Sequence, residues 1–394
     1  MDMKASLFPS QRMETVQVPI IPIISQLIEE NPGTISLAQG VVYYGPPPEI
    51  FEKVAEFGNS IQDHRYGPVQ GSPELIKLIE EKLHVENGVV GDLSERIIVT
   101  AGANMAFLTA LFAITDPGDE IILPTPYYFN QEMAIRMVNC EPVLVKTEDD
   151  FQINPDQIRA AITPKTRAIV TVSPNNPAGV VYSEWVLQEI NNLCRDHGIY
   201  HISDEAYEYF TYDHVRHFSP ASFTGSHDHT ISLYSLSKAY GFASWRIGYM
   251  LIPESLCQSV MKSQDTNLIC ASQIAQVAAV AVMETGASYC REKLTLINET
   301  RKLVLKALET VNHFCSFPES RGAFYVWLKV ETPIDSITLV KKLIKEHRVA
   351  VLPGQAFGFD NDCYLRVSYG ALEPQTAIEG IQRLTQGLIN LCHN

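Results

Sequence analysis

The sequence predicts an α/β protein with a mostly parallel sheet covered by helices, joined to a smaller α+β domain. From residue 97 to residue 252, short apolar segments of strand length alternate with helical segments. Strands separated by helices are joined by crossover connections, which favour parallel pairing. Beyond about residue 283 the pattern becomes helical and then strand-like again, which indicates a second, smaller unit.

The first part of the chain is expected to form an arm. It carries Pro19 and Pro22 and a predicted helix that ends at Asn31-Pro32-Gly33. A rigid turn follows at Gly45-Pro46-Pro47-Pro48, and the apolar spacing over 73–84 predicts a helix. We therefore expect residues 1–45 to form an arm that belongs in part to the small domain.

The candidate strands of the sheet are apolar segments bounded by turn-forming residues. They cover residues 97–100, 120–123, 142–145, 168–172, 200–203, 230–234 and 248–252, and a helix is predicted over 105–114. These elements define a large domain over 46–283. The small domain, 284–394, is expected to be helical to about residue 311 and then to contain a strand at 323–330, a helix at 336–347 and a strand at 364–368.

Composition narrows the functional classes. The net charge of −15 and the pI near 5.2 disfavour binding to nucleic acid, whose phosphates are also negative. None of the eight cysteines forms a C-x-x-C pair and no zinc-ligand spacing is present, so we expect reduced thiols and no metal. Apolar stretches such as 274–283 are too short to cross a membrane, and Met1 to Lys4 begin no apolar signal core. We expect a cytoplasmic protein.

The strongest chemical signal is Lys238, in the run Ser235-Leu236-Ser237-Lys238 after the strand 230–234. A lysine just beyond a buried strand is well placed to form an imine with an aldehyde. Burial and a nearby cation would lower its pKa and favour the free amine. The Ser235 hydroxyl and the Arg246 guanidinium are suitable phosphate ligands. Taken alone, a single lysine is more often a solvated surface charge.

Three more strand ends carry polar residues. Asp204 and Tyr207 follow the strand 200–203, and Asn176 lies in the turn 173–179 after the strand 168–172. The turn Gly102-Ala103-Asn104 opens a helix, whose N-terminal N–H groups would favour an anion such as phosphate. Each of these features is also compatible with an ordinary turn or core residue. Their joint occurrence at strand ends indicates one site.

In this order, these motifs resemble those of the class I/II aminotransferases, the aspartate-aminotransferase-like enzymes of pyridoxal-phosphate (PLP) fold type I. The resemblance covers nearly the whole chain, from Ser36-Leu37-Ala38-Gln39-Gly40 to Tyr364-Leu365-Arg366-Val367-Ser368. It implies the cofactor pyridoxal 5′-phosphate and a reaction that moves an amino group from an L-amino acid to a 2-oxo acid by a ping-pong mechanism.

The resemblance also implies residue roles. Lys238 would be the Schiff-base lysine, Asp204 would hold the pyridine nitrogen, and Tyr207 and Asn176 would hold the 3′-oxygen. Lys238, Asp204 and Tyr207 would thus be the catalytic residues. The phosphate would be bound by Gly102, Ala103, Asn104, Ser235, Arg246 and, more weakly, Ser237. Tyr128, in Pro126-Tyr127-Tyr128, would stack on the cofactor ring.

Substrate and partner contacts are implied in the same way. Arg366 would bind the substrate α-carboxylate, with Gly40 and Asn176 beside it. Tyr66, in Arg65-Tyr66-Gly67, would reach the phosphate of the neighbouring subunit, which implies a homodimer with shared active sites.

The segment after Gly40 departs from the family pattern. Many members have a Pro-Asp-Phe-like sequence there, whereas this chain reads Val41-Val42-Tyr43-Tyr44-Gly45. These residues are expected to approach the substrate side chain, so the resemblance does not identify the substrate. Tyr43, Tyr44 and Tyr128 favour an apolar or aromatic side chain, and no second arginine is placed for a dicarboxylate.

Three other functions remain open at this point. A PLP-dependent β-lyase acting on sulfur amino acids would use the same residues. A non-catalytic PLP-binding regulator would be expected to carry a DNA-binding domain, for which the N-terminal arm is too short. A dinucleotide-binding oxidoreductase would need a Gly-x-Gly-x-x-Gly turn that opens a helix, and the sequence has none.

Overall fold

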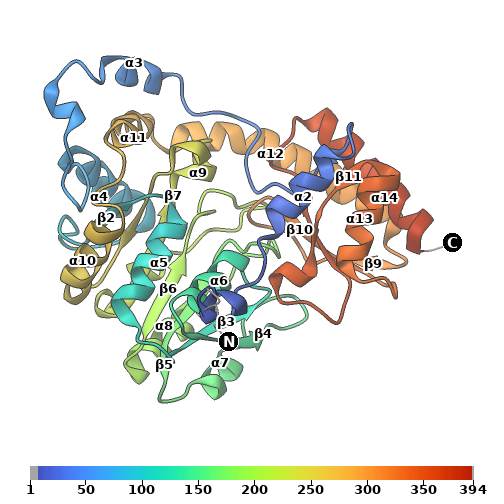
Figure 1. Cartoon of the computed structure of the whole chain (residues 1–394), viewed down its shortest axis with the longest axis horizontal. Coiled ribbons are helices and arrows are strands. Elements are labelled where there is room, and N and C mark those ends of the chain that lie inside the picture. The colour runs from blue at the N-terminus through green and yellow to red at the C-terminus, as the bar shows by residue number, and fades with distance from the viewer. Residues whose placement is uncertain (1–7, 393–394) are drawn as a thin grey trace, which may run out of the picture.

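A computed structural model of the chain describes residues 8–392. Its largest feature is a seven-stranded sheet in the order β2-β8-β7-β6-β5-β3-β4 (Figure 1). The strands are β2 (Ile97–Thr100), β3 (Glu120–Thr125), β4 (Glu141–Lys146), β5 (Thr166–Val172), β6 (Tyr200–Asp204), β7 (Thr230–Ser235) and β8 (Gly248–Leu251). All seven predicted strands are present, with ends shifted by at most two residues.

Pairing in this sheet is mostly parallel, as predicted. Strands β3, β4, β5, β6 and β7 pair in parallel, and only β8 runs antiparallel to its neighbours β2 and β7. Between β7 and β8 the chain forms only the short helix α9 (Leu236–Ala239) and a turn, rather than a helix that crosses a face of the sheet. The connection that carries Lys238 therefore stays at the carboxyl end of β7.

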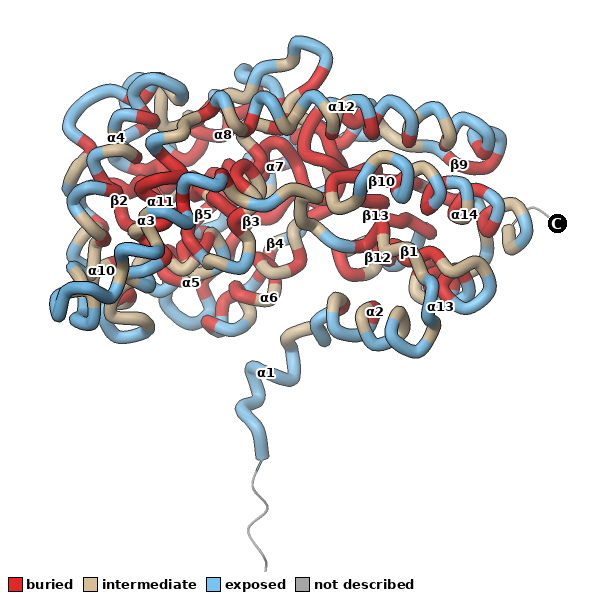
Figure 2. The backbone as a smooth tube through the Cα atoms, turned by 90° about the horizontal axis from the view of Figure 1, so that it is seen from above, coloured by how far each residue is buried: buried red, intermediate tan, exposed pale blue. Residues whose placement is uncertain are grey.

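Helices cover both faces of the sheet because alternate strand residues point to opposite sides. On one face, Ile98, Ile121 and Leu233 pack with helices α5 (Ala103–Ile114), α6 (Phe129–Met137) and α10 (Cys257–Asn267). On the other face lie α4 (Pro73–Asn87), α8 (Glu184–His197) and α11 (Gln273–Thr285). Helices α3 (Glu49–Glu56) and α7 (Pro155–Ala161) complete this part. Figure 2 shows the strands buried in the middle of the molecule.

The C-terminal part is built around a four-stranded antiparallel sheet, as the α+β prediction requires. Its order is β12-β13-β10-β9. The strands are β9 (Cys315–Ser316), β10 (Tyr325–Val330), β12 (Leu352–Pro353) and β13 (Tyr364–Ser368), and the helices are α12 (Ala287–Leu308), α13 (Ser336–His347) and α14 (Pro374–Cys392). The proposed domain boundaries after residues 45 and 283 stay predictions.

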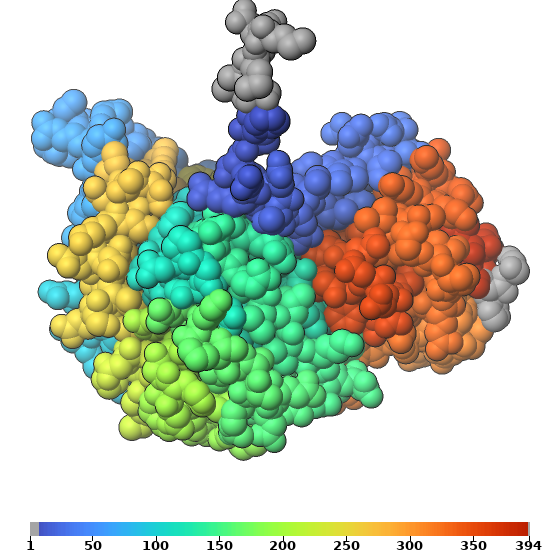
Figure 3. Space-filling view, turned by 60° about the horizontal axis from the view of Figure 1, so that its bottom comes forward, coloured from blue at the N-terminus to red at the C-terminus, as the bar shows by residue number. Residues whose placement is uncertain are grey.

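The N-terminal arm contains helices α1 (Gln11–Thr15) and α2 (Ile20–Glu29) and strand β1 (Ile35–Ser36). Strand β1 pairs in parallel with β11 (Val349–Ala350), which ties the arm to the C-terminal part. Figure 3 shows the arm lying across the junction between the part that holds the large sheet and the C-terminal part. The arm is therefore placed to contribute to a site between them.

Three further observations bear on the sequence predictions. All eight cysteines are free thiols, and each is buried or half-buried. Among the described helices, none has the length and apolar character needed to cross a bilayer. Within residues 8–392, no group of three or more His, Cys, Asp or Glu side chains is arranged to hold a metal ion. Met1 to Lys4 lie outside the described residues.

Candidate active site

Residues from the carboxyl ends of the strands line one cavity. It brings together ten predicted site residues from five separate stretches of the chain: Ala103, Asn104, Tyr128, Asn176, Asp204, Tyr207, Ser235, Ser237, Lys238 and Arg246. Two more residues, Val172 and Ala206, complete its wall. Of the twelve residues predicted to bind the cofactor, only Gly102 and Tyr66 do not line this cavity.

Lys238 sits on the one-turn helix α9, directly after β7. Its Nζ donates a hydrogen bond of 2.5 Å to the backbone oxygen of Gly40. The pKa of Lys238 is lowered to about 8, mainly by burial and in addition by the cations Arg366 and Arg246, against the opposing effect of Asp204. A lysine in this state holds a substantial fraction of free, nucleophilic amine near neutral pH.

Asp204 is the buried last residue of β6. Gln131 of α6 donates a 2.8 Å hydrogen bond to Oδ2, and the Ala206 backbone N–H donates to Oδ1 at 3.2 Å. Burial raises the pKa of Asp204 to about 6, although both hydrogen bonds act in the other direction. The sequence indicated Asp204 but not Gln131, because the two residues are 73 positions apart and no local pattern links them.

Donors gather at the N-terminus of α5. Gly102 caps this helix with φ of 80°, a conformation that suits glycine. A Cβ at Gly102 would lie 2.3 Å from Arg246 Nη2, so only glycine leaves the guanidinium its place. The hydroxyls of Ser235 and Ser237 line the same end of the cavity. Free helix N–H groups, hydroxyls and a guanidinium together form a cradle for an anion such as phosphate.

Arg366, in the middle of β13, is buried with 2% of its surface exposed. Its Nη1 donates to Asn176 Oδ1 at 2.9 Å and its Nη2 donates to the backbone oxygen of Ala38 at 2.7 Å. None of the ion pairs among residues 8–392 includes Arg366, and its buried Nε has no hydrogen-bond partner there. A buried cation without a carboxylate is costly, which makes this position suited to an anionic ligand.

Two tyrosine hydroxyls connect this arginine to the first cavity. Asn176 Nδ2 donates to Tyr207 Oη at 3.2 Å, and Tyr207 Oη and Tyr325 Oη are hydrogen-bonded at 2.8 Å. The ring of Tyr325 also lies under the Arg366 guanidinium, 4.4 Å from its centroid. Sequence reasoning identified Tyr207 and Asn176 but missed Tyr325.

A second cavity adjoins the first and shares four of its residues: Tyr128, Asn176, Tyr207 and Lys238. Arg366 and Gly40 line it, as the substrate-site prediction requires. A Cβ at Gly40 would lie 2.6 Å from Tyr325 Oη, so this position has no room for a side chain. Val41, from the segment expected to approach the substrate side chain, also lines it. The remaining wall was not predicted as part of the site, and it consists of Pro19, Ile21, Gln39, Phe129, Asn130 and Tyr325.

Some predicted residues lie elsewhere. Tyr66 is 80% exposed and lines neither cavity. Tyr44 was expected near the substrate side chain, but within this chain it lines neither cavity. Its hydroxyl instead donates to the backbone oxygens of Lys238 and Ala239, both at 3.1 Å, and so packs behind the lysine. Tyr43 packs edge-on against Tyr44 and lines neither cavity.

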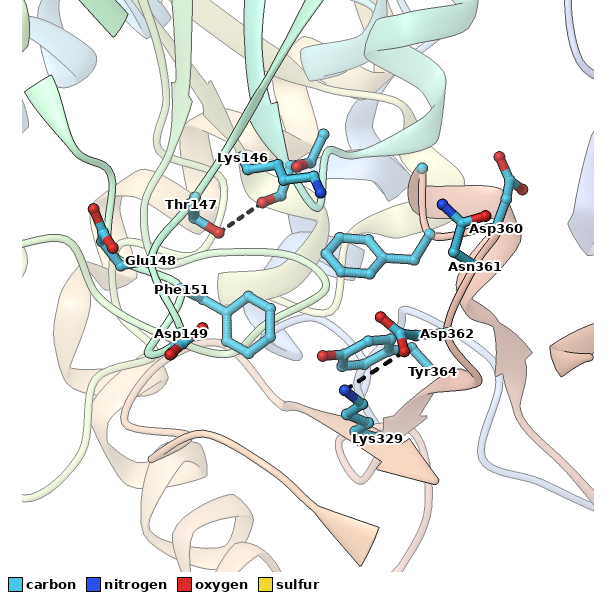
Figure 4. Close-up of a pocket in the computed structure, with 13 residues that line it drawn as sticks. Lys146, Thr147, Glu148, Asp149, Phe151, Lys329, Asp360, Asn361, Asp362 and Tyr364 are labelled. Atoms are coloured by element: carbon cyan, nitrogen blue, oxygen red, sulfur yellow. Dashed lines mark hydrogen bonds and ion pairs between the residues drawn. The ribbon is translucent and has the colours of Figure 1, made fainter. Parts of the chain in front are cut away.

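A separate cleft lies where the end of β4 meets residues 358–364 (Figure 4). It has an acidic rim and an aromatic base, and on one side the Lys329 ammonium lies 3.5 Å from the Asp362 carboxylate. Thr147 donates to the Thr125 backbone oxygen at 2.7 Å in the same cleft. No predicted site residue lines it.

Comparison with known proteins identifies the family. The model of the family "Aminotransferase class I and II" matches residues 32–384. The chain belongs to the class I and II aminotransferases. It is 34% identical to aromatic aminotransferase ISS1 of Arabidopsis thaliana, over 98% of this chain and 97% of that protein. It is 33% identical to an aspartate aminotransferase of Pyrococcus abyssi, over 91% and 93% of the two chains.

Solved aminotransferase structures share the fold. A mutant of Thermus thermophilus aspartate aminotransferase superposes with a TM-score of 0.88 at 28% identity, covering 97% of this chain and 100% of that one. An aromatic aminotransferase from Pyrococcus horikoshii gives a TM-score of 0.85 at 33% identity, covering 93% and 99%. The predicted fold type I architecture is confirmed.

Family membership also decides between the functions left open by the sequence. The protein is an aminotransferase that uses pyridoxal 5′-phosphate and transfers amino groups by a ping-pong mechanism. The residues of the first cavity fit this cofactor chemically. They offer an anion cradle for a phosphate, a buried carboxyl group for a pyridinium nitrogen, and a lysine with lowered pKa for an aldehyde.

Proposed function

We propose that the two adjoining cavities are the cofactor site and the substrate site of this aminotransferase, with Lys238 acting between them. The observation that carries this proposal is Arg366. It is a buried guanidinium without an acidic partner in the described chain, and it faces the same cavity as a lysine whose pKa is near 8. That pair is suited to a small molecule with a carboxylate next to an amino or oxo group.

In the cofactor site, each group of residues has a distinct task. The cradle of Gly102, Ala103, Asn104, Ser235, Ser237 and Arg246 would hold the phosphate. Asp204, held by Gln131 and by the Ala206 N–H, would pair with the ring nitrogen. Tyr207 and Asn176 would donate to the 3′-oxygen, and Tyr128 would cover one face of the ring.

When bound, pyridoxal phosphate supplies an aldehyde that accepts the amino group and a ring that withdraws electrons from the substrate Cα. Arg366 binds the α-carboxylate and so fixes the Cα–H bond toward Lys238. The free amine of Lys238, which lines both cavities, would then act as the general base that takes the Cα proton and as the acid that returns it during the transfer. Asn176 restrains both Arg366 and Tyr207, because its amide bonds to one through oxygen and to the other through nitrogen.

The same site serves both halves of the reaction. A 2-oxo acid carries the same carboxylate next to its reacting carbon as an amino acid, so Arg366 would bind either one. The lowered pKa of Lys238 suits this exchange, since Lys238 must both give and take a proton near neutral pH.

We further propose that the protein is a homodimer with shared active sites, to which Tyr66 contributes the phosphate contact predicted for the neighbouring subunit. Helix α3 and the residues after it stand out from the body of the chain (Figure 1). Phe51, Ile61 and Tyr66 on this segment are 58%, 67% and 80% exposed. Burial of these apolar side chains against a second copy would stabilise the pair. A cytoplasmic location also stays a prediction.

The first experiment compares Lys238→Ala with Lys77→Ala, a lysine whose side chain is 75% exposed on α4. Lys238→Ala is expected to lose the visible absorption of the cofactor-bound protein and its borohydride-reducible adduct, while Lys77→Ala keeps both. Keto acid formation should depend on an added 2-oxo acid acceptor. An adduct that persists in Lys238→Ala would contradict the assignment, and ammonia release without an acceptor would indicate elimination instead.

Shared sites can be tested with hybrid dimers. Lys238→Ala and Tyr66→Ala are each expected to be impaired, but mixed dimers of the two contain one site with both residues intact. Activity should therefore recover on subunit mixing. If mixing restores nothing although hybrids form, Tyr66 does not act across the interface.

A further inference from the structure

The second cavity extends beyond the residues assigned to the α-carboxylate and the cofactor. Its volume of about 370 Å³ lies in the usual range for small-molecule sites. Gly40 lies next to both Lys238 and Arg366, since its backbone oxygen accepts from Lys238 Nζ and its Cβ position is 3.8 Å from Arg366 Nη2. The rest of the wall would then face a substrate side chain. The composition of that wall therefore decides which amino acids bind.

The outer wall is apolar and comes from three parts of the chain. Pro19 and Ile21 come from the N-terminal arm, Val41 from the segment after Gly40, and Phe129 from the start of α6. Phe129 is buried, and its ring packs edge-on against Phe357 with centroids 5.5 Å apart, which fixes the position of this part of the wall. Its polar members are the amides Gln39 and Asn130 and the tyrosine Tyr128.

No basic side chain of the described chain remains free in this wall. The cations that line the cavity are Lys238 and Arg366, and both already have tasks in the proposed mechanism. The single arginine of α6, Arg136, is paired with Glu132, and the same carboxylate accepts a hydrogen bond of 3.2 Å from Gln17 of the arm. Within residues 8–392 of one subunit, the cavity therefore offers no unassigned cation for a second carboxylate.

We propose that this wall, formed by Pro19, Ile21, Val41 and Phe129, is a side-chain subsite for apolar side chains, aromatic ones included, and that it rejects dicarboxylic amino acids and oxo acids. A carboxylate placed there would lose its hydration without gaining a cation. An apolar side chain would instead gain free energy by leaving water and packing against the four side chains of the wall. The inference rests on the proposed substrate site, because it takes Arg366 as the ligand of the α-carboxylate.

Binding measurements test the subsite without catalysis. The two unreactive acids 3-phenylpropionate and succinate each offer one carboxylate to Arg366, but only succinate carries a second. We expect the cofactor-loaded enzyme to bind 3-phenylpropionate at least about tenfold more tightly by calorimetry. In the amino-acid half-reaction, kcat/KM should be about 100-fold higher for phenylalanine and leucine than for aspartate and glutamate.

Variants that add a cation to the wall should invert this preference. Ile21→Arg is expected to raise succinate affinity and aspartate kcat/KM by about tenfold and to lower both values for the aromatic ligands. Val41→Lys provides a second test from another segment. The matched control is Ile23→Arg, which adds the same charge on the same helix at a side chain that is 38% exposed and outside the cavity. This control should leave the ratios unchanged.

The outcomes separate the two proposals. A wild-type enzyme that prefers aspartate and succinate, yet loses both when Arg366 is replaced by lysine, would overturn the apolar subsite and leave the proposed function intact. Failure of Ile21→Arg and Val41→Lys to change the ratio, with both variants folded, would also overturn it. If Arg366→Lys affects neither class of ligand, the proposed substrate site itself is wrong.

Discussion

The lowered pKa of Lys238 leads to a quantitative prediction about capture of the cofactor aldehyde. An ordinary lysine with a pKa of 10.5 is almost entirely protonated at pH 7, whereas about one tenth of a lysine with a pKa of about 8 is free amine. The ratio corresponds to about 300-fold more nucleophile at pH 7. Because burial disfavours the ammonium form, this gain belongs to the folded protein and not to the sequence around Lys238.

The assay follows the rate at which the cofactor-free protein develops the visible absorption of bound pyridoxal phosphate, at several pH values between 6.5 and 10. The rate should rise with pH and level off with an apparent pKa near 8. Arg366→Met removes the larger of the two opposing cations and should shift this pKa upward, whereas Asp204→Asn removes the carboxylate that favours the ammonium and should shift it downward. Arg348→Met is the control, because it removes a cation at the C-cap of α13 that lines neither cavity.

One result would refute this reasoning. If the rate keeps rising through pH 10 without levelling, Lys238 has the pKa of a solvated lysine. The cavity would then not desolvate it, and activation would have to come from elsewhere. A profile that levels near pH 8 but does not respond to either variant would retain the desolvation and exclude the charge effects.

The remaining predictions concern three other positions. Arg366→Lys should lower kcat/KM for amino acids by about 100-fold or more, since lysine cannot bind the carboxylate through two N–H groups as arginine does. It should hardly change the half-reaction of benzylamine, which has no carboxylate. Equal losses for both substrates would contradict the role of Arg366 in carboxylate binding. Gly40→Ala should displace the Tyr325 hydroxyl, because the new Cβ would lie 2.6 Å from it, and should raise KM for amino acids while far-ultraviolet circular dichroism stays unchanged. The buried ring of His201 has a pKa lowered to about 3. Between pH 6.5 and 3, this residue therefore binds a proton in the unfolded chain but not in the folded protein. The free energy of unfolding is thus highest above pH 6.5 and falls as the pH decreases. The loss should be about 2 kcal/mol between pH 6.5 and 5, measured by urea unfolding, and it should disappear in His201→Gln but persist in the exposed control His227→Gln.

The network around His201 explains why that effect should be specific. Asn191 Nδ2 lies 3.1 Å from His201 Nδ1 and also donates to Thr230 Oγ1 at 2.8 Å, so Nδ1 must accept. His201 Nε2 lies 2.9 Å from Thr171 Oγ1 and therefore carries the single proton. Burial is the main cause of the lowered pKa of His201, and the neighbouring His229 lowers it further. A second proton on Nδ1 would also face the donor of Asn191.

Local sequence patterns determined much of the fold. The seven strands of the large sheet were located within two residues because each is a short apolar segment next to turn formers, and that signal is local. The helix Ser336–His347 and the strand Tyr364–Ser368 were predicted to the residue. The two-residue strands β1, β9, β11 and β12 were missed, since so short a segment has no period of its own. The apolar pattern of the sequence also did not specify the antiparallel direction of β8, because that direction depends on how the connection between β7 and β8 folds.

The sequence by itself determined which residues are able to do the chemistry. Lys238, Asp204 and Arg246 stand beside predicted strand ends, and the order of the motifs indicated the family. Only the tertiary structure decided how they act together, since the deciding contacts join distant segments. Lys238 bonds to Gly40 across 198 residues, Arg366 bonds to Asn176 across 190, and Tyr207 bonds to Tyr325 across 118. The substrate wall likewise combines Ile21 with Phe129, because a subsite is defined by surfaces that meet in space and not by residues that follow one another along the chain.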